Sequence, residues 1–209
     1  MCEDQFMATG TTAKGEQRRR GITEAAVALF REQGLAAVRH RAVAKRAGVP
    51  LSATTYYFSS IDDLWSVVVQ ESTLQEHRAM QDRVDRIAVR KRGAEATADL
   101  LVELVVAGPG ELDRTMLMAR AERMSAAARI PSLRAVHQEL APDYTRLVKD
   151  ALRKSGRTIS TLSVGSFAAL VNGWVMSAML YEDVDPRVSI RAALLEIIDV
   201  LAPVVGDEE

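Results

Sequence analysis

Residues 39–58 read RHRAVAKRAGVPLSATTYYF, and this stretch indicates two short helices around a tight turn. A narrow apolar stripe at helical spacing runs through the first of them and comprises Val38, Ala42, Val43 and Ala47. Gly48 follows the last helical position, where a left-handed backbone is needed, and Pro50 suits the start of the next helix. This pattern is typical of a helix-turn-helix, whose second helix lies in the major groove of DNA.

Charge is unevenly distributed along the 209 residues, although the net charge of the whole chain is only −1. Residues 14–58 contain nine Lys or Arg against three Glu, a local net charge of +6 that leaves −7 for the remainder. A basic segment on an acidic body is the charge distribution expected of a DNA-binding protein. The single cysteine excludes a disulfide framework and a cysteine metal site, and the three histidines share no metal-ligand spacing. We expect no metal and no cofactor.

The flanks of the motif carry further residues in a fixed order and spacing. Together with the motif they comprise Ile22, Ala25, Ala26, Phe30, Gly34, Val43, Ala44, Ala47, Gly48, Val49, Tyr56, Phe58, Ser60, Asp63 and Leu64. An αα-hairpin inside a helical bundle would explain the glycine turn but not these flanks. Residues of about 16 to 70, a quarter of the chain, closely resemble the DNA-binding domain of the TetR family of transcriptional repressors.

Contacts to DNA are expected from both helices of the motif. Arg39, His40 and Arg41 lie at the N-terminus of the first helix, where charge and free N–H groups can both bind phosphate. The resemblance implies that Leu51, Ser52 and Thr55 face base edges, and that Tyr56 and Tyr57 lie toward the phosphates.

The rest of the chain is expected to be helical, because no period-two run is long enough for a sheet. Periodicity predicts helices over residues 94–107, 112–130, 132–154, 158–181 and 188–205, with Pro142 kinking or splitting the third. The family implies a ligand pocket among these helices. Residues that could line it are Met116, Arg120, Met124, Tyr144, Asn172, Trp174 and Met176.

The penultimate helix is apolar almost all round, which indicates burial or a membrane span. Burial between subunits is the better account, because the helix carries Asn172 and several serines. In the family, the last two helices form a dimer interface. Its expected members are Leu162, Phe167, Leu170, Trp174, Leu194 and Ile198.

The sequence therefore predicts an all-α chain with three parts: a disordered arm (1–14), a three-helix helix-turn-helix domain (15–62) and a helical ligand-binding and dimerisation domain (63–209). The expected function is that of a cytoplasmic, dimeric repressor, released from a palindromic operator in double-stranded DNA by a small molecule. We expect neither an enzyme nor a membrane protein, since no catalytic pattern and no secretory signal is apparent. The alternative is an adaptor that binds a protein instead, because Ile61 replaces a lysine frequent in the family.

Overall fold

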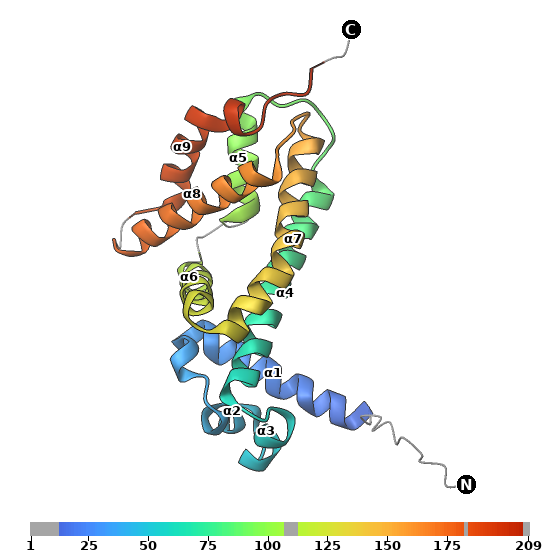
Figure 1. Cartoon of the computed structure of the whole chain (residues 1–209), viewed down its shortest axis with the longest axis vertical. Helices are drawn as coiled ribbons and strands as arrows, with labels where there is room; N and C mark the ends of the chain where they lie inside the picture. Colours follow the sequence, from blue (N-terminus) through green and yellow to red (C-terminus); the bar gives the residue numbers. More distant parts are fainter. Residues whose placement is uncertain (1–12, 107–112, 182–183, 207–209) are drawn as a thin grey trace, which may run out of the picture. The chain divides into compact units, whose positions relative to one another are not determined.

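The computed structural model describes residues 13–106, 113–181 and 184–206, and within them every regular element is helical apart from one β-bridge between Arg157 and Val204 (Figure 1). The prediction of an all-α chain is confirmed. The chain divides at Val68 into two compact units, here called the head (to Val68) and the body (from Val69). Each is described separately below.

The head contains α1 (Ala13–Gln33), the short 3₁₀ helix η1 (Leu35–Ala37), α2 (His40–Ala47), α3 (Leu51–Tyr57) and the first residues of α4 (Ile61–Arg86). Helix α2 packs on both α1 and α3. The helices bury one apolar core, which includes Ile22, Ala26, Phe30, Val38, Val43, Phe58 and Leu64. Because α1 begins at Ala13, the last two residues of the predicted arm are helical; residues 1–12 lie outside the described part of the chain.

The body contains the remainder of α4 and five further helices: α5 (Ala94–Val105), α6 (Arg114–Arg129), α7 (Pro131–Lys154), α8 (Thr161–Met179) and α9 (Pro186–Leu201). Helix α9 packs on α5 and α8, and α7 packs on α6 and α8. Helix α7 also runs alongside α4, since Arg146 Nη1 donates to Gln81 Oε1 (2.9 Å) and Lys154 Nζ donates to Val84 O (2.7 Å) (Figure 1). Phe167, Leu152 and Leu194 lie in the resulting core.

Capping side chains fix where three body helices begin. The carboxylates of Asp113 and Asp185 and the hydroxyl of Ser160 accept bonds from the N–H groups of Met116, Arg187 and Ser163 (2.9–3.0 Å). These caps supply acceptors for N–H groups that a helix leaves unpaired, so α6, α8 and α9 begin two residues or more away from the limits that periodicity predicted.

Pro142 lies inside α7 and does not split that helix. Proline removes one intrahelical hydrogen bond, and here both Pro142 and Gln138, whose carbonyl loses its partner, are exposed. Water can therefore satisfy the carbonyl, which explains why the helix continues.

Candidate functional site

The turn between α2 and α3 has the backbone geometry that the sequence predicts. Gly48 adopts a left-handed conformation (φ 65°), and its N–H and that of Val49 bond carbonyls in the last turn of α2. Pro50 is the N-cap of α3 and thus lies one residue before the predicted position. Thr54 is fully buried, and its hydroxyl donates to Leu51 O (2.8 Å). The buried threonine fixes which face of α3 turns outward.

The outward face of α3 carries the three residues predicted to contact base edges, together with Tyr56. Leu51, Ser52, Thr55 and Tyr56 are exposed, Tyr56 to 83%, whereas Tyr57 is half-buried. The two tyrosine rings meet edge to face, with centroids 5.1 Å apart. Tyr56 thus presents both an apolar ring and a hydroxyl beside Leu51, Ser52 and Thr55.

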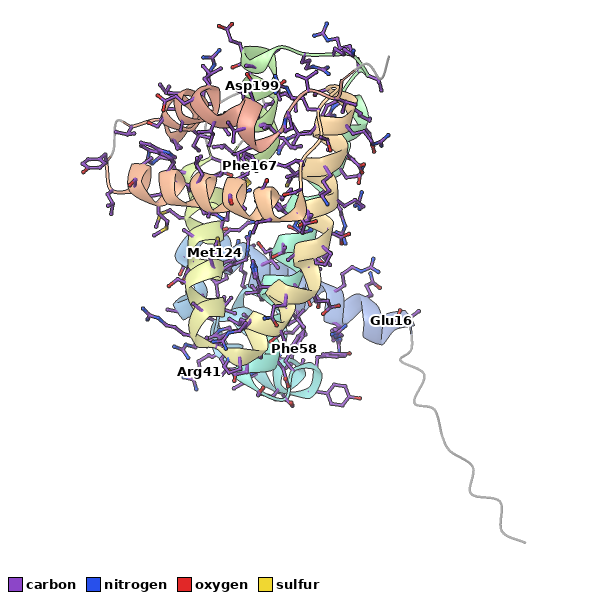
Figure 2. The ribbon with its side chains drawn as sticks, turned by 45° about the horizontal axis from the view of Figure 1, so that its top comes forward. Glu16, Arg41, Phe58, Met124, Phe167 and Asp199 are labelled. Carbon is purple, nitrogen blue, oxygen red and sulfur yellow. The ribbon has the colours of Figure 1, made fainter. Side chains whose placement is uncertain are left out.

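Basic side chains of the head take different positions. Arg41 lies at the surface of the head. It contrasts with the apolar Phe58, which lies in the core (Figure 2). Arg39 lies over the Trp65 ring (5.6 Å to its centroid) and donates from Nε to Ala36 O (3.1 Å), so its guanidinium is oriented yet exposed. His40 is partly buried, with Nδ1 enclosed. Arg46 instead forms a bidentate pair with Glu32 (2.6 and 2.7 Å), which ties α2 to α1.

The body contains a partly open cavity of about 400 Å³ between α4, α6, α7 and α8. Among the described residues its wall is formed by Val69, Thr73, Glu76, His77, Arg120, Arg123, Met124, Ala127, His137, Leu140, Ala141, Tyr144, Thr145, Thr161, Val164, Gly165, Ala168, Ala169 and Asn172. Its volume is within the range of sites for small organic molecules.

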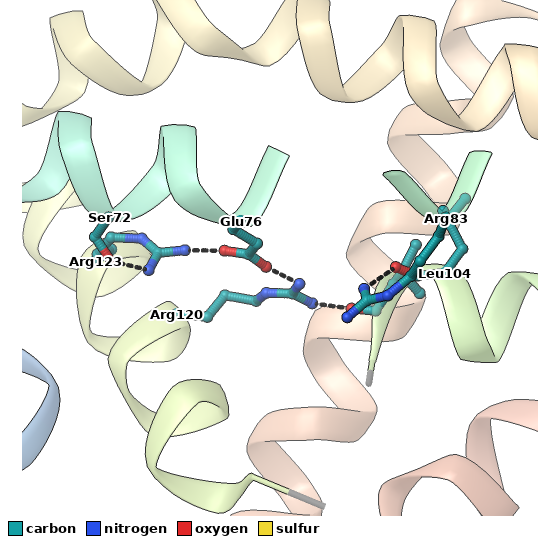
Figure 3. A network of polar contacts seen from close by, with 7 residues as sticks. Ser72, Glu76, Arg83, Leu104, Arg120 and Arg123 are labelled. Atoms are coloured by element: carbon teal, nitrogen blue, oxygen red, sulfur yellow. Dashed lines mark hydrogen bonds and ion pairs between the residues drawn. The ribbon is translucent and has the colours of Figure 1, made fainter. Parts of the chain in front are cut away.

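Two arginines of α6 share one carboxylate of α4 in the wall of this cavity (Figure 3). Arg120 and Arg123 donate to different oxygens of Glu76, Arg123 donates to Ser72 Oγ (3.0 Å), and Arg120 donates to Val105 O (2.6 Å). The three ionic side chains are only 10–12% exposed. The pairing satisfies the carboxylate twice over, which is the condition under which buried charges are tolerated.

Burial shifts the pKa values of the groups in this part of the wall. Desolvation lowers the pKa of Arg120 to about 10, with Arg123 acting in the same direction, so Arg120 stays charged at neutral pH. Desolvation raises the pKa of Tyr144 to about 12 and keeps its hydroxyl neutral. The pKa of His77 is lowered, chiefly by burial, and its Nδ1 has no hydrogen-bond partner among the described residues.

Four of the seven predicted ligand residues lie in the cavity wall: Arg120, Met124, Tyr144 and Asn172. Met176 lines an adjoining hollow of about 330 Å³ that shares Arg120, Met124 and Asn172 with the first. Met116 and Trp174 line neither hollow; Met116 lies one helical turn before Arg120 on the same face of α6.

Sequence reasoning missed the contribution of α4 to the cavity. Ser72 and Glu76 are four residues apart, and Arg120 and Arg123 three apart, so each pair lies on one helix face. That spacing was the available signal, but nothing local indicates that these two faces meet. Within the described residues, no group of three His, Cys, Asp or Glu is placed to hold a metal ion.

The expected dimer interface needs a correction. Phe167, Leu194 and Ile198 are buried in the body's own core (0–2% exposed), so they are not available to a partner. Of the other expected members, Leu162 and Trp174 are exposed on α8 and Leu170 is partly exposed, so these three remain accessible to a partner. Among the described helices, only α8 is long and apolar enough to cross a membrane (mean hydropathy 1.4), and 28% of it is buried.

Comparisons with known proteins cover both units. Residues 22–67 match the model of the bacterial regulatory proteins of the tetR family, and residues 92–200 match the tetracyclin repressor-like C-terminal domain. The HTH-type transcriptional regulator PksA of Bacillus subtilis is 35% identical over 91 residues, 43% of this chain and 42% of PksA. The dual regulator CecR of Shigella flexneri is 42% identical over 59 residues, 28% of this chain and 26% of CecR. The aligned part thus spans well under half of these curated relatives.

Solved structures resemble the chain over nearly its whole length. The multidrug binding protein EbrR complexed with proflavin is 27% identical, with a TM-score of 0.66 over 86% of this chain and 99% of EbrR. The regulator SCO7518 from Streptomyces coelicolor A3(2) is 28% identical, with a TM-score of 0.65 over 87% of this chain and 98% of that protein. Because one family model matches the head and another matches more than half of the chain, the protein belongs to the TetR family of bacterial regulatory proteins.

Proposed function

We propose that this protein is a dimeric, DNA-binding regulator of transcription whose hold on a palindromic operator is released when a small molecule enters the body cavity. The observation that carries the proposal is the head: α3 presents Leu51, Ser52, Thr55 and Tyr56 outward, next to the exposed arginines Arg39 and Arg41. Hydroxyl and methyl groups on such a helix suit base edges, and arginines suit phosphates. Family membership supports the same function.

The cavity supports a small-molecule effector. It combines an apolar wall with a few polar side chains, the usual composition of a ligand site. EbrR, which shares the fold, has been crystallised with proflavin, with ethidium and with imidazole. Regulation requires that the effector bind more tightly to the arrangement of the protein that cannot hold DNA.

The exposed stripe of α8 supports a homodimer. Leu162, Ser166 and Trp174 are exposed on a side of the helix that lines neither hollow, and the small Ser166 permits close approach of a second helix. A two-fold dimer would also bring two copies of α3 to successive major grooves. Sedimentation equilibrium tests this: Ser166→Arg should yield monomers, whereas Gln138→Arg on the exposed side of α7 should leave the dimer intact. A monomeric wild type, or its retention by detergent micelles, would contradict the dimer.

Selection from random duplex DNA followed by sequencing tests the function as a whole. We expect a palindrome whose half-sites are about one helical turn or more apart, recovered at both low and high salt. Weak, salt-sensitive and sequence-independent retention would overturn the proposal and favour the adaptor alternative, in which the head binds a protein. A recovered operator would then serve in a screen for the effector.

A further inference from the structure

The described wall of the body cavity has more cationic than anionic side chains. Among its ionic side chains, two guanidiniums face one carboxylate, since Arg120 and Arg123 both bond Glu76. Asp143 and Arg146 of α7 also act on His77, in opposite directions, and they pair with each other (3.7 Å). Among the described wall residues, charged guanidiniums therefore outnumber carboxylates by one.

This charge is not removed by deprotonation. Arg120 remains protonated at neutral pH although burial lowers its pKa to about 10. A guanidinium has five N–H donors. Among the described residues, Arg120 uses two of them, in its bonds to Glu76 and Val105. Arg120 thus has both charge and donors to offer to a bound group.

The remainder of the wall is neutral or apolar. Val69, Leu140 and Val164 form the apolar part, with four alanines. Tyr144, Asn172 and His77 contribute neutral polar groups. A ligand that matches this wall needs an apolar body and one anionic end.

We infer that the effector is an amphipathic organic carboxylate, with its carboxylate at Arg120 and Arg123 and its apolar body against Val69, Leu140 and Val164. The inference rests on the proposed role of the cavity as the effector site. A carboxylate accepts parallel bonds from a guanidinium, and such charged hydrogen bonds are about twice as strong as neutral ones. A lipophilic cation such as proflavin, the ligand of EbrR, would be repelled by the same wall.

Calorimetric titration of the full-length, DNA-free protein with three probes of equal size tests the inference: octanoate, octan-1-ol and octylammonium. Their apolar bodies are identical, so differences in affinity report the charge of the head group. We expect octanoate to bind at least tenfold more tightly than octan-1-ol, and octylammonium to bind most weakly. Octylammonium or proflavin binding as tightly as octanoate would overturn the inference, and so would failure of octanoate to bind.

Two variants locate the preference. Arg120→Met leaves the Arg123–Glu76 pair intact and should abolish the preference for octanoate over octan-1-ol, while Arg120→Lys should keep most of it. Arg83→Met is the matched control, because Arg83 is a half-buried arginine of α4 that donates to Leu104 O (2.9 Å) and does not line the cavity (Figure 3). A preference that survives in a folded Arg120→Met protein would exclude Arg120 as the binding group. If Arg120→Met does not fold, the three titrations of the wild-type protein still show whether the cavity prefers a carboxylate.

Failure of this inference is distinguishable from failure of the proposed function. If octanoate binds but the protein selects no operator, the carboxylate site stands without a regulatory role. If an operator is selected and only cations bind the cavity, the function stands and the ligand class is wrong.

Discussion

Two arginines of the head and three of the body have opposite surroundings. In the head, Arg39 and Arg41 are exposed, and Arg39 is oriented by the Trp65 ring. In the body, Arg120 and Arg123 are enclosed with Glu76 (Figure 3), and Arg157 is 2% exposed, with its Nη1 bonded to Asp199 (2.7 Å) and Ala202 O (2.8 Å). Exposed charges act on external partners and are screened by salt, whereas buried charges are screened little and must be paired. Under the proposed function, the exposed arginines attract DNA at long range and the buried arginines of the cavity select the effector.

Removal of the shared carboxylate is the strongest test of this contrast. Glu76→Gln leaves two buried guanidiniums without their counter-charge, so the free energy of unfolding should fall by about 3–5 kcal/mol. Urea unfolding followed by circular dichroism measures the loss. Glu71→Gln is the control, because Glu71 pairs with Arg78 near the surface (3.1 Å) and should cost well under ~1 kcal/mol. Equal losses in the two variants would show that Glu76 is not the counter-charge of the cavity.

The turn between α2 and α3 depends on backbone conformation. Substitution of two glycines distinguishes this effect from an effect of side-chain packing. An added Cβ would meet no atom within 4 Å at Gly48 or at Gly21, but only Gly48 has a positive φ (65°). Gly48→Ala should therefore destabilise the head by about 1–2 kcal/mol, whereas Gly21→Ala, within α1, should stabilise it by about 0.5–1 kcal/mol. Thermal unfolding of both variants measures the shifts. Shifts of the same sign would contradict the role assigned to the left-handed residue.

The exposed head residues should divide into those that hold the DNA backbone in position and those that determine which base sequence is bound. Arg41→Ala should weaken binding to every sequence alike and reduce the salt slope by about one phosphate contact, ~0.9 in log K against log salt. Thr55→Ala should change base preference, on the order of 1 kcal/mol at one base pair. Fluorescence anisotropy on operator and scrambled duplexes measures both effects. Arg153→Ala, an exposed arginine of α7, controls for net charge. Sequence-blind losses from both head variants would refute the division.

The smallest expected effect is a pH dependence from His77. Burial lowers its pKa below the ordinary 6.5, Arg123 and Arg146 act in the same direction, and Asp143 opposes them. As pH falls through about 6.5, the unfolded chain takes up a proton before the native one, so stability decreases. His77→Gln should flatten this decrease below about pH 6.5, and Asp143→Asn should steepen it. Denaturant unfolding at several pH values measures the free energy of unfolding of both proteins. If His77 is not the titrating group, this free energy will depend on pH in the same way in the wild type and in His77→Gln.

The head could be predicted from sequence in detail because its determinants are local. Gly48 marks a left-handed backbone, Pro50 the start of a helix, and the stripe through Val38 and Val43 a buried face, all within a few residues. Such signals act through short-range sterics and helical periodicity, which do not depend on distant parts of the chain. Thr54 escaped notice because its burial depends on how α3 packs on α2.

In the body, the sequence by itself determined that the chain is helical, apolar in places and without a sheet. Only the tertiary structure decided which charges meet and which apolar residues remain outside. Glu76 and Arg120 are 44 residues apart, and Ser72 and Arg123 51 apart, yet they form one cluster. Likewise, Phe167 and Leu162 share an apolar helix, but Phe167 is in the core and Leu162 is 83% exposed. Burial of charge and choice of core face depend on the helices packed around a residue, and no local pattern encodes that packing.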